Sequence, residues 1–322
     1  MKRKVYLGVD VGSVSTNFVL MNEADEIVEK LYLRTLGQPI KVIQEGLKLL
    51  TNLGEWEVLG VGVTGSGRQL AGSLLRADVI KNEITAHSVA ACHEVPDVQT
   101  VLEIGGQDSK IIILRNQVVA DFAMNTVCAA GTGSFLDQQA ARLNINIEDF
   151  GKIALTSTNP VRIAGRCTVF AESDMIHKQQ LGVSLPDILA GLCEAMVRNY
   201  LNNVAKGKEI LPPVVFQGGV AANKAMKVAF EQALGLETSV PRHFDVMGAL
   251  GVSILAREQV TKKGKTTFSG FEIIDNKITT QTFECHDCPN HCEIVRISDQ
   301  ESLIACWGSR CGKFEKVANI AI

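Results

Sequence analysis

The sequence lacks the features of membrane, secreted and nucleic-acid-binding proteins. No apolar run in its 322 residues approaches the ~20 residues that a membrane-spanning helix needs. Charged residues make up only 21% of the chain and the net charge is −3, which indicates neither disorder nor a nucleic-acid-binding surface. The first residues lead directly into a strand pattern, without the apolar core of a signal peptide. We therefore expect a cytoplasmic protein without a membrane or nucleic-acid partner.

Cysteine, in contrast, is abundant, with nine residues. Disulfides are rare in a reducing compartment, so clustered cysteines there indicate metal or redox sites. Cys92 and Cys193 lie within helical patterns, and we expect both to be buried core thiols. The other seven are Cys128, Cys167, Cys285, Cys288, Cys292, Cys306 and Cys311.

Cys128 and Cys167 each begin a sequence that is typical of a loop opening into a helix. The two sequences are Cys128-Ala-Ala-Gly-Thr-Gly-Ser-Phe and Cys167-Thr-Val-Phe-Ala-Glu-Ser. Helix N-termini present free N–H groups and a partial positive charge, so they favour thiolates and anionic clusters. An iron–sulfur cubane needs four thiolates and this pair of motifs supplies two, so two copies related by a twofold axis would supply all four.

The order of the predicted elements repeats one α/β plan, which predicts two similar lobes. The first copy has strands at 5–10, 17–21 and 27–33, a helix at 40–53, a strand at 58–64 and a helix at 84–94. The second has strands at 100–104, 111–114 and 118–124, and later a strand at 212–217 with helices at 220–234 and 245–258.

Changes in composition predict the domain boundaries. We expect a first ATPase lobe at 1–95, with the helix at 245–258 packing back on it, and a second lobe at 96–244 that carries the first two cysteine motifs. A polar, glycine-containing linker at 259–270 then leads to a separate cysteine-rich unit at 271–322.

Three glycine turns at strand ends predict a phosphate-binding fold. In Asp10-Val-Gly12-Ser13-Val-Ser15-Thr16, the glycine permits close approach to a phosphate and the aspartate suits Mg²⁺. Gly105-Gly106-Gln107-Asp108 repeats this plan in the second copy, and Gly218-Gly219 suits an adenosine. Each alone is more often an ordinary turn, but three in this order favour a nucleotide site. The pattern Gly60-Val-Gly62-Val-Thr-Gly65 is not counted among them, because its glycines lie mostly within a strand.

Six segments together resemble the ATP-dependent activators of 2-hydroxyacyl-CoA dehydratases. That family includes the ATPase subunits of benzoyl-CoA reductase and the reductases of double-cubane cluster proteins (BadF/BadG/BcrA/BcrD-type ATPases). The resemblance runs from about Lys4 to Arg257. The segments are 10–16, Val63-Thr-Gly-Ser-Gly-Arg68, 105–110, 125–133, 167–173 and Gly218-Gly-Val-Ala-Ala-Asn223.

The resemblance implies an actin/Hsp70/sugar-kinase (ASKHA) fold of two lobes with ATP and Mg²⁺ between them. It also implies an anaerobic homodimer that shares one [4Fe–4S] cluster, bound by Cys128 and Cys167 of each subunit. Such proteins take one electron from ferredoxin or flavodoxin. They use ATP hydrolysis to pass it to an iron–sulfur acceptor metalloenzyme of the dehydratase or double-cubane type.

We expect Asp10 and Asp108 to be catalytic, because both carboxylates lie on phosphate loops, where Mg²⁺ or the attacking water must be held. Arg68 and Glu172 also lie in family motifs, without an assigned role. The implied nucleotide-binding residues are Asp10, Gly12, Ser13, Ser15, Thr16, Gly105, Gly106, Gln107, Asp108, Gly218, Gly219 and Asn223.

The C-terminal cysteines depart from the shortest family members. Cys285, Cys288, Cys292 and Cys311 have a spacing that suits Zn²⁺ or a second iron–sulfur cluster, and surface thiols without a metal remain the alternative. Whether Cys306 is a ligand stays open. We expect His286 and His291 to be turn residues while four cysteines are available.

Two other functions fit the predicted fold. A small-molecule kinase would need a carboxylate base beside a substrate pocket, which the sequence does not identify, and would not need paired cysteines at helix starts. A Hsp70-like ATPase would have cysteines that are merely buried. A colourless protein after anaerobic purification would favour either alternative.

Overall fold

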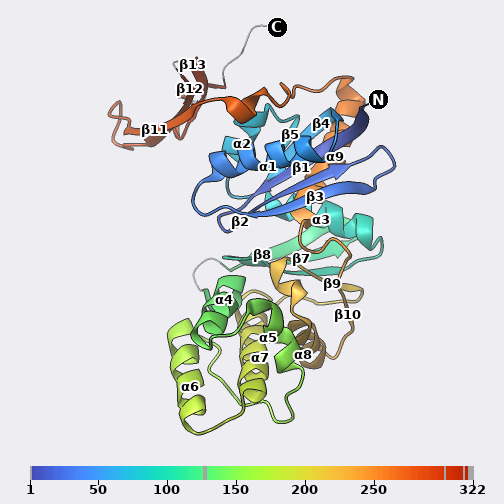
Figure 1. Ribbon diagram of the computed structural model, residues 1–322, viewed down its shortest axis with the longest axis vertical. Coiled ribbons are helices and arrows are strands. Elements are labelled where there is room, and N and C mark those ends of the chain that lie inside the picture. Colours follow the sequence, from blue (N-terminus) through green and yellow to red (C-terminus); the bar gives the residue numbers. More distant parts are fainter. Residues whose placement is uncertain (1, 126–128, 301, 315, 318–322) are drawn as a thin grey trace. The chain divides into compact units, whose positions relative to one another are not determined.

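The computed structural model describes residues 2–125, 129–300, 302–314 and 316–317. The chain packs as two compact units, each with its own five-stranded sheet (Figure 1). None of the helices among the described residues is long and apolar enough to cross a membrane. The first unit comprises Met1–Gly12, Thr16–Lys81 and Val252–Ile322, and the second comprises Ser13–Ser15 and Asn82–Gly251.

The two sheets repeat one topology, which confirms the duplicated plan. Their strand orders are β3-β2-β1-β4-β5 and β10-β9-β6-β7-β8. In each, the first strand is antiparallel to the second and parallel to the fourth. The strands of the first sheet are β1 (Arg3–Val11), β2 (Ser15–Met21), β3 (Ile27–Arg34), β4 (Trp56–Thr64) and β5 (Val79–Ile80). Those of the second are β6 (Thr100–Ile104), β7 (Ser109–Arg115), β8 (Val118–Met124), β9 (Val214–Gln217) and β10 (Thr238–Ser239).

Helices cover both faces of the first sheet. Alternate residues of β1, from Val5 to Val11, pack with α1 (Pro39–Leu53) and α2 (Arg68–Leu75) in one apolar core. On β4, Gly60 and Gly62 approach α9 (Met247–Lys263) so closely that a Cβ on Gly62 would lie 2.0 Å from the carbonyl oxygen of Val252. These two glycines therefore serve helix–sheet packing.

In the second unit, α3 (Glu83–Glu94) covers one face of the sheet and the other helices lie on the opposite side (Figure 1). The long helix α7 (Leu185–Asn203) supplies much of this unit's apolar core. The remaining helices are α4 (Gly133–Arg142), α5 (Ile147–Ala154), α6 (Thr168–Gln180) and α8 (Lys224–Leu234), with short 3₁₀ turns η1 (Ala129–Gly131) and η2 (Gly219–Ala222).

Two predicted helices have different bounds in the structure. The helix expected at 220–234 is split into η2 and α8, because the side chain of Asn223 caps α8 by accepting from the backbone N–H groups of Ala225 and Met226. The helix expected at 245–258 continues to Lys263, so the first residues of the expected linker are helical. Cys193 is buried as predicted, whereas the prediction for Cys92 is wrong because that thiol, near the end of α3, is only partly buried.

The C-terminal segment shares the core of the first unit. Ile273 and Ile297 are buried in the cluster that includes β1 and α1. The side-chain amide of Gln44 on α1 donates to the carbonyl oxygens of Ile273 and Asn276. The composition alone predicted a separate unit for this segment. That ATP hydrolysis and the shared cluster do not need the segment stays a prediction. The segment contains η3 (Glu272–Asp275) and a sheet of β11 (Ile278–Glu284), β12 (Glu293–Asp299), β13 (Ser302–Trp307) and β14 (Lys316–Val317).

Candidate functional site

The first predicted phosphate loop lies between β1 and β2. Thr16, at the start of β2, is fully buried, and its hydroxyl hydrogen-bonds that of Thr35 at 2.9 Å. Thr35 also donates to the carbonyl oxygen of Gly12 at 2.8 Å. Thr16 therefore positions the loop from inside the unit, while Ser13 is exposed and Ser15 is partly exposed.

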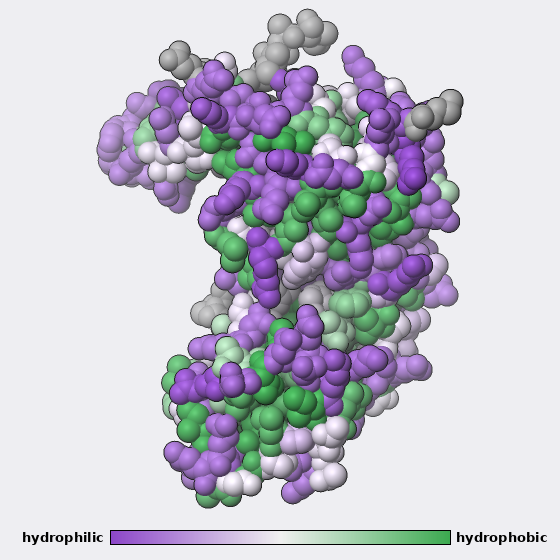
Figure 2. All heavy atoms as spheres, in the orientation of Figure 1, coloured by the Kyte–Doolittle hydropathy of each residue, from purple (hydrophilic) through white to green (hydrophobic). Residues whose placement is uncertain are grey.

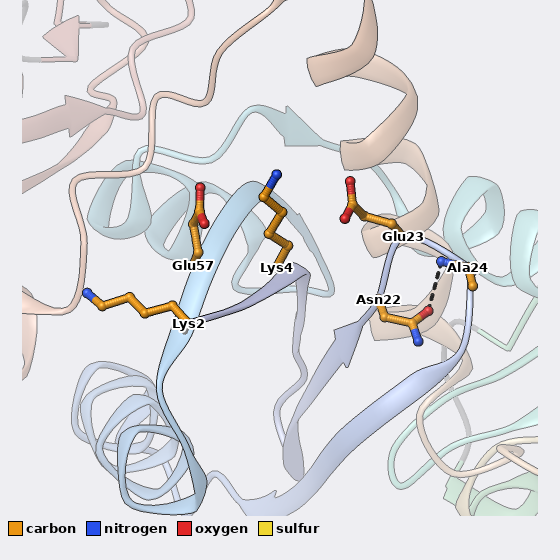
Figure 3. Close-up of a pocket in the computed structure, with 6 residues that line it drawn as sticks. All are labelled: Lys2, Lys4, Asn22, Glu23, Ala24 and Glu57. Carbon is orange, nitrogen blue, oxygen red and sulfur yellow. Dashed lines mark hydrogen bonds between the residues drawn. The ribbon is translucent and has the colours of Figure 1, made fainter.

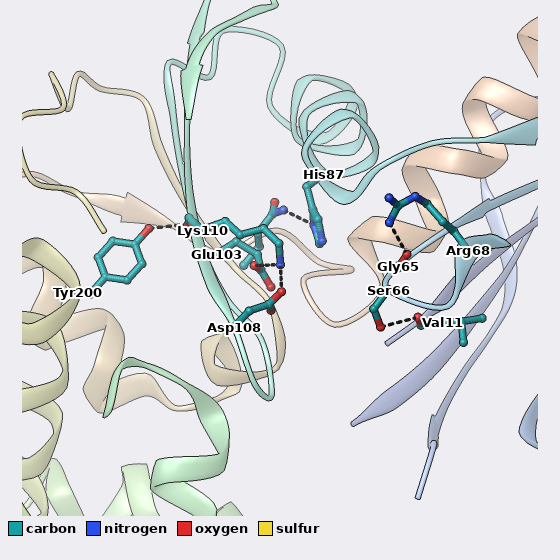
Figure 4. A network of polar contacts seen from close by, with 10 residues as sticks. Val11, Gly65, Ser66, Arg68, His87, Glu103, Asp108, Lys110 and Tyr200 are labelled. Carbon is teal, nitrogen blue, oxygen red and sulfur yellow. Dashed lines mark hydrogen bonds and ion pairs between the residues drawn. The ribbon is translucent and has the colours of Figure 1, made fainter. Parts of the chain in front are cut away.

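A second turn, between β4 and α2, lies against the end of β1. The N–H of Gly67 donates to the carbonyl oxygen of Val11 at 2.8 Å, and the hydroxyl of Ser66 also lies near that oxygen (Figure 4). Gly65 has φ +94°, and a Cβ there would lie 2.6 Å from Oδ1 of Asp10, so glycine is required. The guanidinium of Arg68 donates to the carbonyl oxygen of Gly65. The turn that contains Arg68 therefore lies directly beside Asp10.

The second predicted phosphate loop is the β6–β7 hairpin turn. Gly105 donates its N–H to the carbonyl oxygen of Asp108 at 2.9 Å, which closes the turn. Lys110, opposite Glu103 in the strand register, contacts the carboxylates of Asp108 at 2.7 Å and Glu103 at 3.1 Å (Figure 4). Lys110 and Glu103 are almost completely buried, whereas the side chain of Asp108 is 39% exposed. The lysine therefore holds one oxygen of Asp108 while the carboxylate still reaches solvent.

Burial and charge shift two pKa values in this network. Burial alone would lower the pKa of Lys110, but Glu103 and Asp108 outweigh it and raise that pKa. Burial, and secondarily the charge of Lys110, lowers the pKa of His87 to about 3. The Nδ1 of His87 lies 2.9 Å from the side-chain amide nitrogen of Gln217. A neutral imidazole can accept that hydrogen bond at Nδ1, so we expect His87 to be uncharged in the native protein.

The third glycine turn begins directly after Gln217. Gly218 has φ +89°, and a Cβ there would lie 2.4 Å from the carbonyl oxygen of Ile104 at the end of β6. Only glycine fits this close approach of two strand ends. The structure thus brings Gly105 and Gly218 to the same edge of the second sheet.

The second phosphate loop is hydrogen-bonded to the start of α4. The N–H of Gly133 donates to the carbonyl oxygen of Gly105, and that of Ser134 to Gly106, both at 2.8 Å. The hydroxyl of Ser134 also donates to the carbonyl oxygen of Gly106 at 2.6 Å. These three bonds join the loop directly to the start of α4. Cys128 precedes α4 in the sequence and lies outside the described residues.

Cys167 is the N-cap residue of α6, as its motif predicted, and its thiol is partly exposed. The segment before it passes so close to α7 that a Cβ on Gly165 would lie 2.7 Å from the carbonyl oxygen of Ala195. Buried Asn199 donates to the carbonyl oxygen of Gly165, and its Oδ1 would lie 3.0 Å from a Cβ on Gly131. Asn199 thus lies between the segments that precede α4 and α6.

The two helices that follow the cysteine motifs are joined by an ion pair. Arg142, the last residue of α4, pairs with Glu172 in the second turn of α6. Next to Cys167, Val169 and Phe170 are 66% and 69% exposed. Apolar side chains reach the surface on the face of this unit that bears α4 and α6 (Figure 2). Burial of such side chains is favourable, so this face suits a protein contact.

Two further groups of residues lie in the first unit. An open hollow is lined by Lys2, Lys4, Asn22, Glu23, Ala24 and Glu57 (Figure 3). Its charged side chains are exposed, and the side chain of Asn22 closes its own turn by accepting from the N–H of Ala24, so nothing there points to a ligand. The second group is the cysteine-bearing end of the C-terminal sheet, where Cys285, Cys288, Cys292 and Cys311 lie on two neighbouring loops.

Sequence reasoning missed the residues that position the site. Lys110, Arg142 and Asn199 were not selected, and Glu172 was given no role. A signal for Lys110 existed, because the hairpin turn places it opposite Glu103 in two mostly apolar strands. The contacts of Arg142 and Asn199 depend on helix packing between distant segments, for which we find no local sequence signal.

Comparison with known proteins places the chain among nucleotide-dependent activators. The sequence model of the BadF/BadG/BcrA/BcrD ATPase family matches residues 7–256. The chain is 34% identical over 259 residues to the (R)-2-hydroxyglutaryl-CoA dehydratase activating ATPase of Acidaminococcus fermentans, covering 80% of this chain and 98% of that protein. The C-terminal cysteines lie beyond the family match.

Solved structures give the same result for the fold. The activator of 2-hydroxyisocaproyl-CoA dehydratase from Clostridium difficile, with bound ADPNP, has a TM-score of 0.75 and 30% identity and covers 81% of this chain and 97% of that chain. A glucokinase of the ROK family from Streptomyces griseus, at 11% identity, covers 79% of this chain and 99% of that chain with a TM-score of 0.52. This second likeness concerns the fold alone, and the predicted two-lobed ASKHA fold is confirmed.

Proposed function

Because the chain belongs to the BadF/BadG/BcrA/BcrD ATPase family, we propose that it is an ATP-dependent activator of an iron–sulfur metalloenzyme. It would couple ATP hydrolysis to the transfer of one low-potential electron into a partner of the 2-hydroxyacyl-CoA dehydratase or double-cubane type. The electron donor would be ferredoxin or flavodoxin, and the protein would act in the cytoplasm. The relatives in the same family that activate dehydratases support this proposal.

ATP and Mg²⁺ would be bound by the loops already described. Asp10 with Gly12, Ser13 and Ser15 forms the first phosphate loop, with Thr16 supporting it from inside. In the second loop, Gly105 to Asp108 presents a carboxylate that Lys110 holds in one orientation. Gly218, Gly219 and Asn223 would lie beside the adenosine. The turn closed by Gly105 and the positive φ of Gly218 give two backbone loops of the kind that bind phosphate and adenosine groups.

Cys128 and Cys167 of each subunit would hold a [4Fe–4S] cluster shared by a homodimer. The position of Cys167 carries this part of the proposal: a partly exposed thiol at a helix N-terminus suits an anionic cluster. The exposed Val169 and Phe170 beside it suit burial by a second copy. A Hsp70-like ATPase with merely buried cysteines agrees less well with the exposure of Cys167. When bound, the cluster would supply a one-electron carrier.

Hydrogen bonds offer a route between the nucleotide and the cysteine motifs. A shift of Gly105 and Gly106 on hydrolysis would move the start of α4 through Gly133 and Ser134. The pair Arg142–Glu172 would pass that movement to α6. Changing a one-electron potential by about 240 mV requires about 5.6 kcal/mol. A nucleotide supplies such a bias if it binds two states of the dimer with different affinity.

Iron analysis of anaerobically purified protein tests the shared cluster. We expect about four irons and four sulfides per dimer in the unmodified protein. Cys128→Ser and Cys167→Ser should each lose them, because each substitution removes two of four thiolates. Cys92→Ser, at a partly buried thiol of α3, is the matched control and should retain the iron. Full iron content in either of the first two variants would contradict the shared site.

A further inference from the structure

The C-terminal sheet presents three cysteines in one hairpin loop. Strands β11 and β12 are antiparallel, and Glu284 opposite Glu293 is their last pair. Beyond it the N–H of Cys285 donates to the carbonyl oxygen of Cys292 at 2.8 Å, so the first and third cysteines face each other across the hairpin. Cys288 is at the tip, where its carbonyl oxygen accepts from the N–H of His291 at 3.3 Å.

A fourth cysteine lies on the loop that follows β13. Gly308, with φ +114°, passes so close to β12 that a Cβ there would lie 2.3 Å from the carbonyl oxygen of Glu293. Further along this loop the ammonium of Lys313 pairs with the carboxylate of Asp287, which lies between Cys285 and Cys288. These contacts anchor the loop to the hairpin on both sides of Cys311.

Cys306 does not belong to this group. It lies within β13, opposite Arg296 in the strand register, and is only 6% exposed. Cys288 and Cys311, in contrast, are exposed, and Cys285 and Cys292 are partly exposed. The fold thus separates one buried core thiol from four thiols at one end of the sheet.

The hairpin tip has no apolar core of its own. None of the residues from 285 to 292, all of which the structure describes, is buried. Two buried residues of the segment, Ile273 and Ile297, lie in the core of the first unit instead. Ordering a loop of this length costs conformational entropy, which thiolate–metal bonds can offset where apolar burial does not.

We propose that Cys285, Cys288, Cys292 and Cys311 bind one Zn²⁺ as a tetrahedral tetrathiolate site that orders the end of the C-terminal sheet. Binding deprotonates the four thiols and releases four protons, with no change of oxidation state. The exposure of Cys288 and Cys311 favours a redox-inactive ion, because a closed zinc site tolerates contact with water. This site is independent of the proposed electron transfer and of the cluster cysteines.

A neighbouring group of side chains is the competing ligand set. Glu284, His286 and His291 have ligating atoms within 4.8 Å of one another, whereas no three sulfur atoms of the described cysteines lie that close. All three are exposed, and Nδ1 of His291 is already 2.7 Å from the carboxylate of Glu284. The loop of Cys311 is anchored to the hairpin on both sides of that residue, by Gly308 and by Lys313, and metal binding would turn the thiols about their side-chain torsions. Zinc binds a set of soft thiolates in preference to an exposed carboxylate with two imidazoles.

Metal binding by the full chain tests the proposal. In a Cys128→Ala/Cys167→Ala background, which removes the core thiolates, we expect one zinc per chain by mass spectrometry after exchange against a weak chelator. Replacing zinc by Co²⁺ should give the intense visible bands of tetrahedral cobalt and a thiolate-to-cobalt charge-transfer band. Cys285→Ser and Cys311→Ser should each lose the zinc, whereas Cys306→Ser should retain it.

Three results would overturn this assignment. The first is a zinc content that survives Cys285→Ser and Cys311→Ser but is lost in His286→Ala/His291→Ala. The second is iron with sulfide in place of zinc, and the third is a chain that binds neither metal. Limited proteolysis of the unmodified chain does not depend on whether a variant folds. Zinc should slow cleavage within 285–292 at least about tenfold, because metal binding orders this loop. Cleavage that zinc leaves unchanged would also contradict the site.

Discussion

Arg142 at the end of α4 forms an ion pair with Glu172 in α6, so the helices that follow the two cysteine motifs are directly joined. The side chain of Glu172 is 22% exposed and that of Arg142 is 48% exposed. Exposed ion pairs contribute little to stability, typically below about 1 kcal/mol. We therefore assign this pair to the coupling between helices and not to the folding of the unit.

Breaking this pair should uncouple the helices without unfolding the protein. In Glu172→Gln we expect the iron content and thermal stability to stay near those of the unmodified protein, while the rate of ATP-driven electron transfer to the acceptor falls about tenfold or more. The charge-reversed double variant Arg142→Glu/Glu172→Arg should recover part of that rate. Unimpaired electron transfer in Glu172→Gln would contradict the coupling.

Asp108 should be needed for hydrolysis but not for the cysteine site. Its carboxylate lies 2.7 Å from the ammonium of Lys110, on the loop where we propose that the reacting phosphate binds and that its charge is balanced through Mg²⁺ or a water. Asp108→Asn should lower the ATPase rate at least about 100-fold and leave the iron content unchanged. Asp97→Asn, at an exposed turn after α3, is the matched control. An ATPase rate in Asp108→Asn equal to that of the control would refute the placement of the nucleotide.

Lys110→Met should destabilise the second unit. The buried carboxylate of Glu103 would lose the ammonium that lies 3.1 Å from it, which costs about 3–5 kcal/mol of unfolding free energy. Denaturant unfolding measures this loss. The additional substitution Glu103→Met should restore most of it, because no buried charge then remains. Lys152→Met removes an exposed partner of Asp149 and should leave the midpoint unchanged. A midpoint for Lys110→Met equal to that of this control would contradict the buried pair.

His87 should make the protein less stable as the pH falls. Its pKa is about 3 in the native protein, against 6.5 for an ordinary histidine. Between these values the unfolded chain binds a proton that the native protein does not, so stability is full above about pH 6.5 and declines toward pH 3. From pH 7 to pH 5 the loss should be about 2 kcal/mol. In His87→Gln this part of the pH dependence should disappear, and an unchanged slope would show that His87 is protonated in the native protein.

The sequence was sufficient for features that depend on local pattern. The duplicated strand order, the position of Cys167 at a helix start and the location of Gly60 and Gly62 within a strand were all predicted and confirmed. Each rests on hydrophobic periodicity or on the special conformations of glycine turns. The bounds of α8 were missed because Asn223 acts as its cap, a role that competes with helix continuation.

Features that depend on packing between distant segments could not be predicted. The position of Asn199 between two loops follows from the way α7 crosses the segments near Gly131 and Gly165. The burial of Ile273 and Ile297 in the first unit could not be predicted either. In the sequence, each lies in a short apolar patch within a polar tail. Such contacts follow from the tertiary fold, which changes the environment of a residue without changing its local pattern.

The most direct test of the proposed function is the EPR spectrum of the reduced, anaerobically purified protein, recorded with and without MgATP. The account predicts the signal of one reduced [4Fe–4S] cluster per dimer, which is absent in Cys167→Ser and changes in shape or potential when MgATP is added. A colourless protein that hydrolyses ATP at the full rate would contradict the account. So would a cluster signal that persists in Cys167→Ser or is unchanged by the nucleotide.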